Sequence, residues 1–162
     1  MTITAAKRIP YSDTSIAPEM TQGKIQRMLY DYGAKAVQWT EVGDQVELKF
    51  IITDDKGRPF TVRVRPPMLV SRKRTQGKYG SLANFVNKAA SFRLLWWWLK
   101  SKLEAVSYGL VTFEQEFLAN IAGHLPGGEE VTVGDLLIPK LAGMDLTDLA
   151  RALPAPKEKP RE

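Results

Sequence analysis

The sequence predicts an α+β fold: a short N-terminal helix, a three-stranded antiparallel meander, then a long central helix and two or three shorter helices. Apolar residues first recur at helical spacing, alternate with polar residues between Ala34 and Pro66, and return to helical spacing from Ser81. The 162 residues, 44% of them hydrophobic, suffice for one packed domain. We therefore expect a flexible arm at 1–20, a single domain at 21–153 and a disordered, Pro-rich tail at 154–162.

The first helix and the meander follow from local signals. The helix is expected to begin after Thr21, a suitable N-cap, and to end at Gly33. A hairpin with its turn at Gly43-Asp44 follows, and a third strand, FTVRVRP, comes after the turn signal at 54–57. Alternation gives the meander one buried face and one polar face. The cations expected on the polar face are Lys49, Arg63 and Arg65.

The central helix is predicted over residues 81–108, with Ser81 as its N-cap and Gly109 as its end. The apolar stripe along it consists of Phe85, Ala89, Phe92, Trp96, Leu99, Leu103 and Val106. This stripe must be covered by the rest of the chain, or by a second copy in a homo-oligomer. Trp97 lies off the stripe in a row with Arg93 and Lys100, so we expect an exposed aromatic ring between two cations.

Two further helices are predicted after the central one. A capping box of Thr112 and Gln115 begins the first, which Gly123 would end. The connection before it is short, so this helix is expected to pack against the central helix as a hairpin. Thr132 is expected to cap the second, which Pro139 bends.

Composition excludes several classes of site. The chain has no cysteine and one histidine, His124, which argues against disulfides, thiolate chemistry and histidine-based zinc sites. We therefore expect no cofactor, no metal and no catalytic motif. The N-terminus lacks the apolar core of a signal peptide, and the longest apolar run, Leu94 to Leu99, is too short to cross a membrane. We expect a soluble, cytoplasmic protein.

Positive charge is concentrated in the middle third of the chain. Residues 56–104 carry twelve Lys or Arg and one acid, whereas the segments on either side are both net acidic. Such a basic segment is typical of proteins that bind nucleic acid. The alternative is a solvated basic face that the acidic ends of the protein balance.

Within this basic third, residues 66–80 are predicted to form an irregular loop, because glycines punctuate them and no periodicity is present. Arg72, Lys73, Arg74 and Lys78 could contact phosphates, and Tyr79 could stack on a base. The alternative is a solvent-exposed linker.

These observations favour non-catalytic binding of nucleic acid, with single-stranded DNA preferred. The candidate binding residues are Lys49, Arg63, Arg65, Arg72, Lys73, Arg74, Lys78, Tyr79, Arg93, Trp97 and Lys100. The alternative is a protein–protein interaction module, with the tryptophans as interface anchors.

A third alternative is a metal-dependent nuclease. Asp44, Glu47 and Lys49 form D-x-x-E-x-K, which weakly resembles the (D/E)-x-K strand of one nuclease superfamily. In that superfamily two acids hold a divalent metal and the lysine positions water. Asp44 lies only three residues before Glu47, closer than in the family pattern. The ordinary polar side of an amphipathic strand predicts the same residues and is favoured.

Residues 99–121, LKSKLEAVSYGLVTFEQEFLANI, together with the upstream MLYDYGAKAVQW, resemble a group of small bacteriophage and prophage proteins of uncharacterised activity. The resemblance extends over about residues 21–135. Its motifs are structural, so the resemblance implies a phage genomic context, with the host cytoplasm as the location, and no particular mechanism. In that context the expected nucleic-acid-binding protein would be an accessory of phage replication or recombination. The alternative interaction module would be a phage inhibitor of a host enzyme or defence system.

Overall fold

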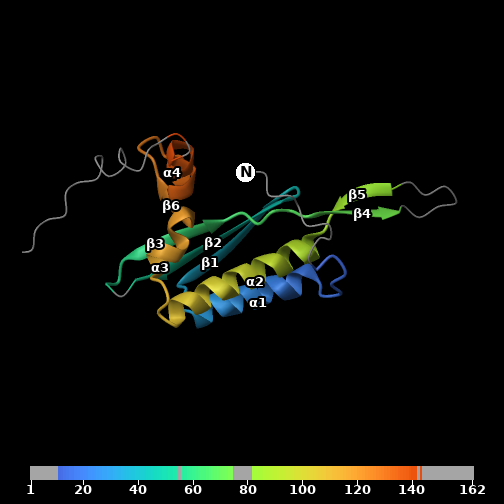
Figure 1. Ribbon diagram of the computed structural model, residues 1–162, viewed down its shortest axis with the longest axis horizontal. Helices are drawn as coiled ribbons and strands as arrows, with labels where there is room; N and C mark the ends of the chain where they lie inside the picture. The colour runs from blue at the N-terminus through green and yellow to red at the C-terminus, as the bar shows by residue number, and fades with distance from the viewer. Residues whose placement is uncertain (1–10, 55, 75–81, 142, 144–162) are drawn as a thin grey trace, which may run out of the picture.

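The structure is a computed structural model that describes residues 11–54, 56–74, 82–141 and 143. It confirms the α+β fold, with an N-terminal helix, an antiparallel meander and a long central helix (Figure 1). The elements are α1 Pro18–Asp31, β1 Ala36–Val42, β2 Gln45–Thr53, β3 Pro59–Val64, β4 Val70–Arg74, β5 Leu82–Val86, α2 Lys88–Ser107, α3 Phe113–Phe117, the 3-10 turn η1 Leu118–Asn120, β6 Ile121–His124, β7 Glu130–Thr132 and α4 Val133–Leu141.

The main sheet is antiparallel and has the strand order β1-β2-β3-β6-β7. The predicted meander is its first part, and the β1–β2 turn lies at Gly43, whose positive φ of 59° suits glycine. β6 and β7 extend the sheet beyond the sequence prediction. β6 pairs with β3 through two positions, Thr61 with Ala122 and Val62 with Ile121.

The hydrophobic core lies between the sheet and the two helices α1 and α2, which run side by side along one face (Figure 1). Its members include Ile25, Leu29, Leu48, Phe50, Val62, Val64, Leu95, Leu99, Leu103 and Phe117. The apolar side of α2 is thus covered within one chain. That removes the reason for expecting a second copy along the stripe.

α1 begins at Pro18, inside the predicted arm at 1–20, and no side chain caps it. Proline suits the first turn because its missing N–H would have no helical partner there. Thr21, which the sequence suggested as the N-cap, is instead fully buried within the helix. The predicted end of this helix is close to the observed one, since Gly33 follows it with φ 91°.

The start predicted for the central helix is wrong. α2 begins at Lys88, and the Asn87 side chain caps it by accepting a hydrogen bond from the Ala90 N–H at 3.0 Å. Residues 82–86 form β5, which pairs with β4. Because β4 covers residues 70–74, part of the loop predicted at 66–80 is also a strand. The buried stripe is shifted as well. Leu95 is buried, whereas Trp96 is only partly buried against the core.

The capping box of Thr112 and Gln115 is confirmed, but the helix that it begins is short. α3 ends at Phe117, and the predicted continuation of this helix to Gly123 is wrong. After η1 the chain forms β6, whose backbone groups pair with those at the edge of β3. The cap predicted at Thr132 is also confirmed, because Thr132 and Asp135 exchange hydrogen bonds of 2.9 and 3.1 Å.

Pro139 lies inside α4, as the sequence predicts. No helix in the described part of the chain has the length and apolar character to cross a membrane. The tail predicted at 154–162 and residues 1–10 of the predicted N-terminal arm lie outside the described residues.

Candidate nucleic-acid interface

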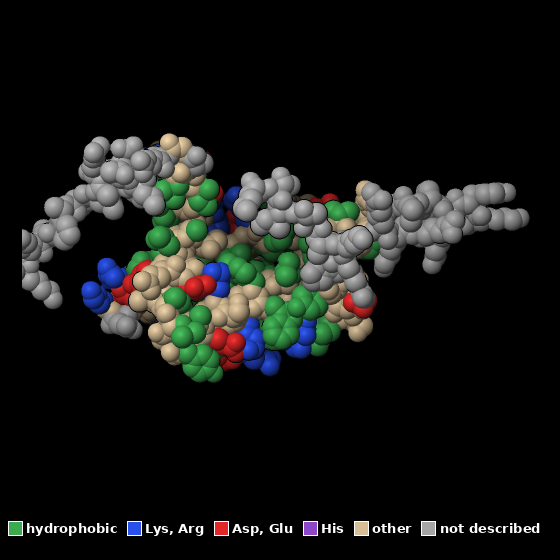
Figure 2. All heavy atoms as spheres, viewed as in Figure 1, with side chains coloured by type: hydrophobic (Ala, Val, Ile, Leu, Met, Phe, Trp, Pro, Cys, Tyr) green, Lys and Arg blue, Asp and Glu red, His purple; other side chains and the backbone are tan. Residues whose placement is uncertain are grey.

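A shallow hollow of about 370 Å³ lies between α1 and α2. Its lining residues are Lys24, Arg27, Met28, Asp31, Tyr32, Trp96 and Lys100. Figure 2 shows basic, acidic and hydrophobic side chains side by side along the lower edge of the molecule, where Figure 1 places the two helices. Cations beside aromatic and apolar surface are the combination that single-stranded nucleic acid requires.

Trp96 and Trp97 form an aromatic pair at one end of this hollow. Their ring centres are 4.6 Å apart in an edge-to-face arrangement. Arg93, one turn earlier on α2, places its guanidinium 4.9 Å from the Trp96 ring centre and 5.9 Å from that of Trp97. Trp97 is 43% exposed. The helical spacing therefore predicted correctly an accessible tryptophan next to a cation.

Lys100 contributes less charge than its position suggests. Its ammonium is hydrogen-bonded to Glu104 one turn later, and this bond is the main reason why the pKa of Lys100 lies above its ordinary value. Within the hollow, the acid Asp31 further reduces the positive balance. Lys24, Arg27 and Arg93 are the cations left to act on a polyanion.

Lys24 and Arg27 were missed by sequence reasoning. They are three residues apart on α1, so they share a helical face. In the part of the chain that the structure describes, neither has an ion-pair partner. The spacing is visible in the sequence, but only the packing of α1 along α2 brings both cations beside Trp96.

Lys49, Arg63 and Arg65 lie on the polar face of the sheet, as predicted, but they are engaged in ion pairs. Lys49 donates to Glu130 at 2.7 Å, and Arg65 donates to Glu47 at 2.7 Å. Their charge is therefore largely compensated within the protein. Their role in binding nucleic acid remains a prediction that the fold weakens.

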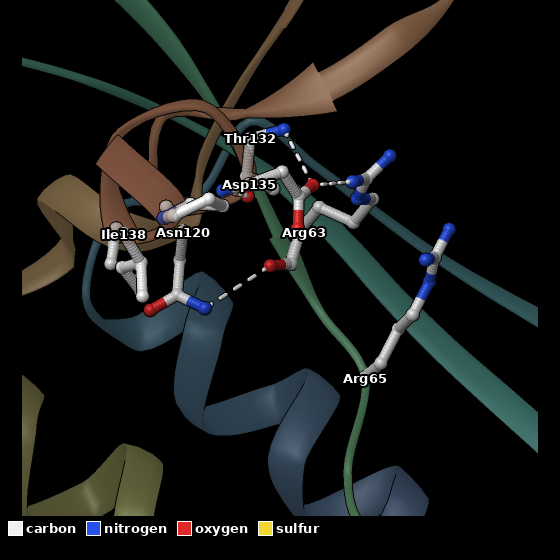
Figure 3. A pocket seen from close by; sticks show the side chains of 9 residues that line it. Arg63, Arg65, Asn120, Thr132, Asp135 and Ile138 are labelled. Carbon is white, nitrogen blue, oxygen red and sulfur yellow. Dashed lines mark hydrogen bonds and ion pairs between the residues drawn. The ribbon is translucent and has the colours of Figure 1, made fainter. Parts of the chain in front are cut away.

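Arg63 is held most firmly of these three cations. Its side chain is only 7% exposed, and it donates to the Asp135 carboxylate at 2.6 Å (Figure 3). It also donates to the Glu130 carbonyl at 2.9 Å. It lines a hollow of about 510 Å³ together with Arg65, Asn120 and the first turn of α4 (Figure 3). This arrangement joins the main sheet to α4 and leaves little of Arg63 for a ligand.

The ion pairs on this face shift two pKa values. Burial opposes ionisation of Glu47, but hydrogen bonds from Arg65 and Lys49 outweigh it and hold its pKa below the ordinary value. The hydrogen bond to Glu130 is the main cause that raises the pKa of Lys49, and burial opposes it. Both groups are therefore stabilised in their charged forms.

The residues of the D-x-x-E-x-K pattern lie in the β1–β2 turn and on β2. Asp44 lies in the β1–β2 turn, while Glu47 and Lys49 share the polar face of β2 and pair with each other at 3.4 Å. Arg65 and Glu130 complete their contacts. No three His, Asp or Glu side chains converge to hold a metal ion among the residues described. The pattern has the form of a polar strand face.

The predicted basic loop divides between a strand and a segment outside the described residues. Arg72, Lys73 and Arg74 lie on β4, which pairs with β5. Lys78 and Tyr79 lie outside the described residues. The structure thus brings Arg93, Trp97 and Lys100 together with Lys24 and Arg27, and it places the β4 cations on a separate element.

Comparison with known proteins gives no further guide. No protein-family model, curated protein or solved structure matches the chain. The function therefore rests on the chemistry of the surface between α1 and α2 and of the elements that adjoin it.

Proposed function

We propose that the protein is a non-catalytic nucleic-acid-binding protein that prefers single-stranded DNA. The observation that carries the proposal is the exposed Trp97, which lies beside Trp96 with Arg93 over both rings. A base stacked on an aromatic side chain contributes about 1–3 kcal/mol. Bases of a duplex are already stacked on each other, so an exposed ring favours single strands.

The electrostatic contribution comes from Lys24, Arg27 and Arg93. Lys24 and Arg27 line the hollow with Trp96, and Arg93 lies over both tryptophan rings, so a phosphate backbone that passed the aromatic pair would meet all three cations. Each phosphate that they neutralise releases condensed counterions, so binding should weaken as salt rises. Taken with the resemblance to phage and prophage proteins, a role as an accessory of phage replication or recombination would follow.

The test is fluorescence anisotropy with a labelled oligothymidylate at ~50 and ~200 mM NaCl, a range over which phosphate contacts lose much of their affinity. Trp97→Ala should raise the dissociation constant about fivefold or more, which corresponds to the lower end of one stacked base. Lys24→Ala with Arg27→Ala should weaken binding at low salt and reduce its salt dependence by roughly two phosphate contacts.

The matched control removes two cations from other parts of the surface, Lys56→Ala with Lys140→Ala, both of which are exposed. It should alter binding far less than the α1 variant. The proposal is wrong if the control and the α1 variant weaken binding equally, or if the wild-type protein binds no single strand at low salt.

A second candidate, a protein–protein interaction module, is favoured by α4. Leu136, Leu137, Ile138 and Leu141 are all between 40% and 61% exposed, which is unusual for four apolar residues on one short helix. Salt distinguishes the two functions. A partner bound through these residues should keep its affinity between low and high salt, whereas nucleic-acid binding should fall steeply.

A further inference from the structure

β4 and β5 form a two-stranded ribbon that belongs to no larger sheet among the described residues. The register pairs Val70 with Val86 at the base and Arg74 with Leu82 at the last described position. Figure 1 shows the ribbon extending away from the main body, beyond the N-terminal end of α2. A two-stranded ribbon without a sheet or helix to cover it has marginal stability of its own, so its base needs support.

That support comes from the residues that begin α2. The Asn87 N–H donates to the Leu69 carbonyl at 2.7 Å, and the Leu69 N–H donates to the Ser91 hydroxyl at 2.9 Å. The Asn87 amide also donates to the Ser71 hydroxyl at 3.1 Å. The base of the ribbon is therefore fixed to the first turn of α2, on the helix that carries Arg93 and Trp97.

The ribbon is strongly basic. Arg72, Lys73 and Arg74 are consecutive on β4, and the sequence has no Asp or Glu between residues 56 and 103. In register these three residues are paired along the backbone with Asn84, Ala83 and Leu82 of β5, none of which is acidic.

We infer that this ribbon binds a groove of double-stranded nucleic acid, so that the preferred ligand is a junction between duplex and single strand. The inference rests on the proposed function, since the single-stranded arm would lie on the α1–α2 face. The major groove of B-form DNA is about 12 Å wide and admits a two-stranded β-ribbon. The three consecutive basic residues of β4 would supply the contacts to the phosphates that border the groove.

The spacing of the two surfaces suits one ligand. Trp97 is ten residues after Asn87 on a straight helix, which corresponds to about 15 Å along its axis. A nucleic-acid strand advances about 3.4 Å for each nucleotide, so four or five nucleotides separate the base of the ribbon from the exposed ring. A duplex held by the ribbon could therefore pass its unpaired strand to Trp97 within half a helical turn.

The experiment measures the affinity of the full-length protein for three labelled ligands: a single strand, a blunt duplex, and the same duplex with a single-stranded overhang. The variants are Arg72→Ala with Arg74→Ala, Trp97→Ala, and the control Lys56→Ala with Lys140→Ala. The wild-type protein should bind the overhang ligand about tenfold or more tightly than either part alone, because two linked contacts reinforce each other.

The ribbon variant should lose duplex binding and the advantage of the overhang, while its affinity for the single strand stays within about twofold of wild type. Trp97→Ala should show the opposite pattern. Arg72→Gln with Arg74→Gln, which keeps polar side chains on the strand, should reproduce the ribbon variant, and circular dichroism should show unchanged folding for both.

The inference is wrong if the ribbon variants bind the duplex as the wild-type protein does, or if they weaken binding to all three ligands equally. It is also wrong if the overhang ligand binds no more tightly than the better of its two parts. Failure of the proposed function has a different signature, namely a wild-type protein that does not bind the single strand at low salt.

Discussion

Arg63 donates a hydrogen bond to the Asp135 carboxylate at 2.6 Å and thereby joins the middle of the sheet to the first turn of α4. The two partners differ in exposure, with 7% of the Arg63 side chain and 55% of the Asp135 side chain accessible to water. Removing Asp135 should therefore lower the free energy of unfolding by a different amount than removing Arg63, because only the charge of Arg63 would be left buried without its partner.

Asp135→Ala should lower the midpoint of urea unfolding more than Arg63→Met does. The first variant leaves a buried guanidinium with the Glu130 contacts alone, whereas the second leaves a carboxylate that water can solvate and replaces the guanidinium with an apolar side chain. The double variant should cost less than the sum of the two single changes. Strictly additive losses would show that the pair is not coupled.

Leu99→Ala should destabilise the protein by about 2–5 kcal/mol, because Leu99 is fully buried in the core and its loss leaves a cavity. Trp97→Ala, two positions earlier on the same helix, should cost less than Leu99→Ala, because 43% of the Trp97 surface is already exposed to water. Chemical denaturation of both variants gives the comparison. A larger loss for Trp97→Ala would mean that this ring is part of the core.

Two glycines should respond oppositely to alanine. At Gly134 a Cβ would lie 2.7 Å from the Ala119 carbonyl oxygen, so Gly134→Ala should force α4 away from η1 and cost about 1–3 kcal/mol. At Gly23, in the middle of α1, a Cβ would meet nothing within 4 Å, so Gly23→Ala should stabilise by about 0.4–1 kcal/mol. Equal effects in thermal unfolding would contradict the packing of α4 on η1.

The free energy of unfolding should depend on pH in both acid and alkaline solution, because Glu47 and Lys49 on the polar face of the sheet have shifted pKa values. The pKa of Glu47 is lowered by folding, so its contribution is complete above the ordinary value of 4.5 and is lost as pH falls through the folded-state value. The pKa of Lys49 is raised, so its contribution is complete below 10.5 and is lost as pH rises through the folded-state value. Stability from this pair should therefore be constant between these limits.

The measurement is the urea midpoint as a function of pH for the wild-type protein and for Glu47→Gln. The variant should show a shallower decline below pH 4.5. Glu129→Gln, on an exposed side chain, is the control and should retain the wild-type decline. If Glu47→Gln leaves the acid limb unchanged, other carboxylates are responsible for it.

Strong local signals predicted much of the fold. Gly43 and the alternation on both sides of it specified the β1–β2 hairpin, and the Thr112 capping box specified the start of α3. Their success has one physical reason, since the turn and the cap are decided by neighbours within a few residues. The helix around Trp97 was predicted for the same reason.

The errors occurred where long-range pairing outweighs local preference. Residues 82–86 fit a helical stripe, yet they pair with β4 because the backbone groups of that strand need partners. Ile121 to His124 likewise fit the end of a helix, yet they pair with β3 and β7. Lys24 was missed for a similar reason, because its place beside Trp96 depends on the packing of two helices distant in sequence.

The pairing of β3 with β6 also bears on how the chain folds during synthesis. Thr61 and Ala122 are 61 positions apart, so α1 and the first three strands leave the ribosome well before β6 exists. Amide protection in pulsed hydrogen exchange should accordingly arise in β1 and β2 before β6.

During that interval β3 is an open edge strand, whose unpaired backbone could recruit a second nascent chain. Its own residues counter this hazard. Pro59 is the first residue of the strand and Pro66 follows it, while Arg63 and Arg65 place charge at its C-terminal end. In the folded protein Arg63 pairs with Asp135 and Arg65 pairs with Glu47. Before α4 and the completed sheet have formed, the same two arginines would thus oppose aggregation.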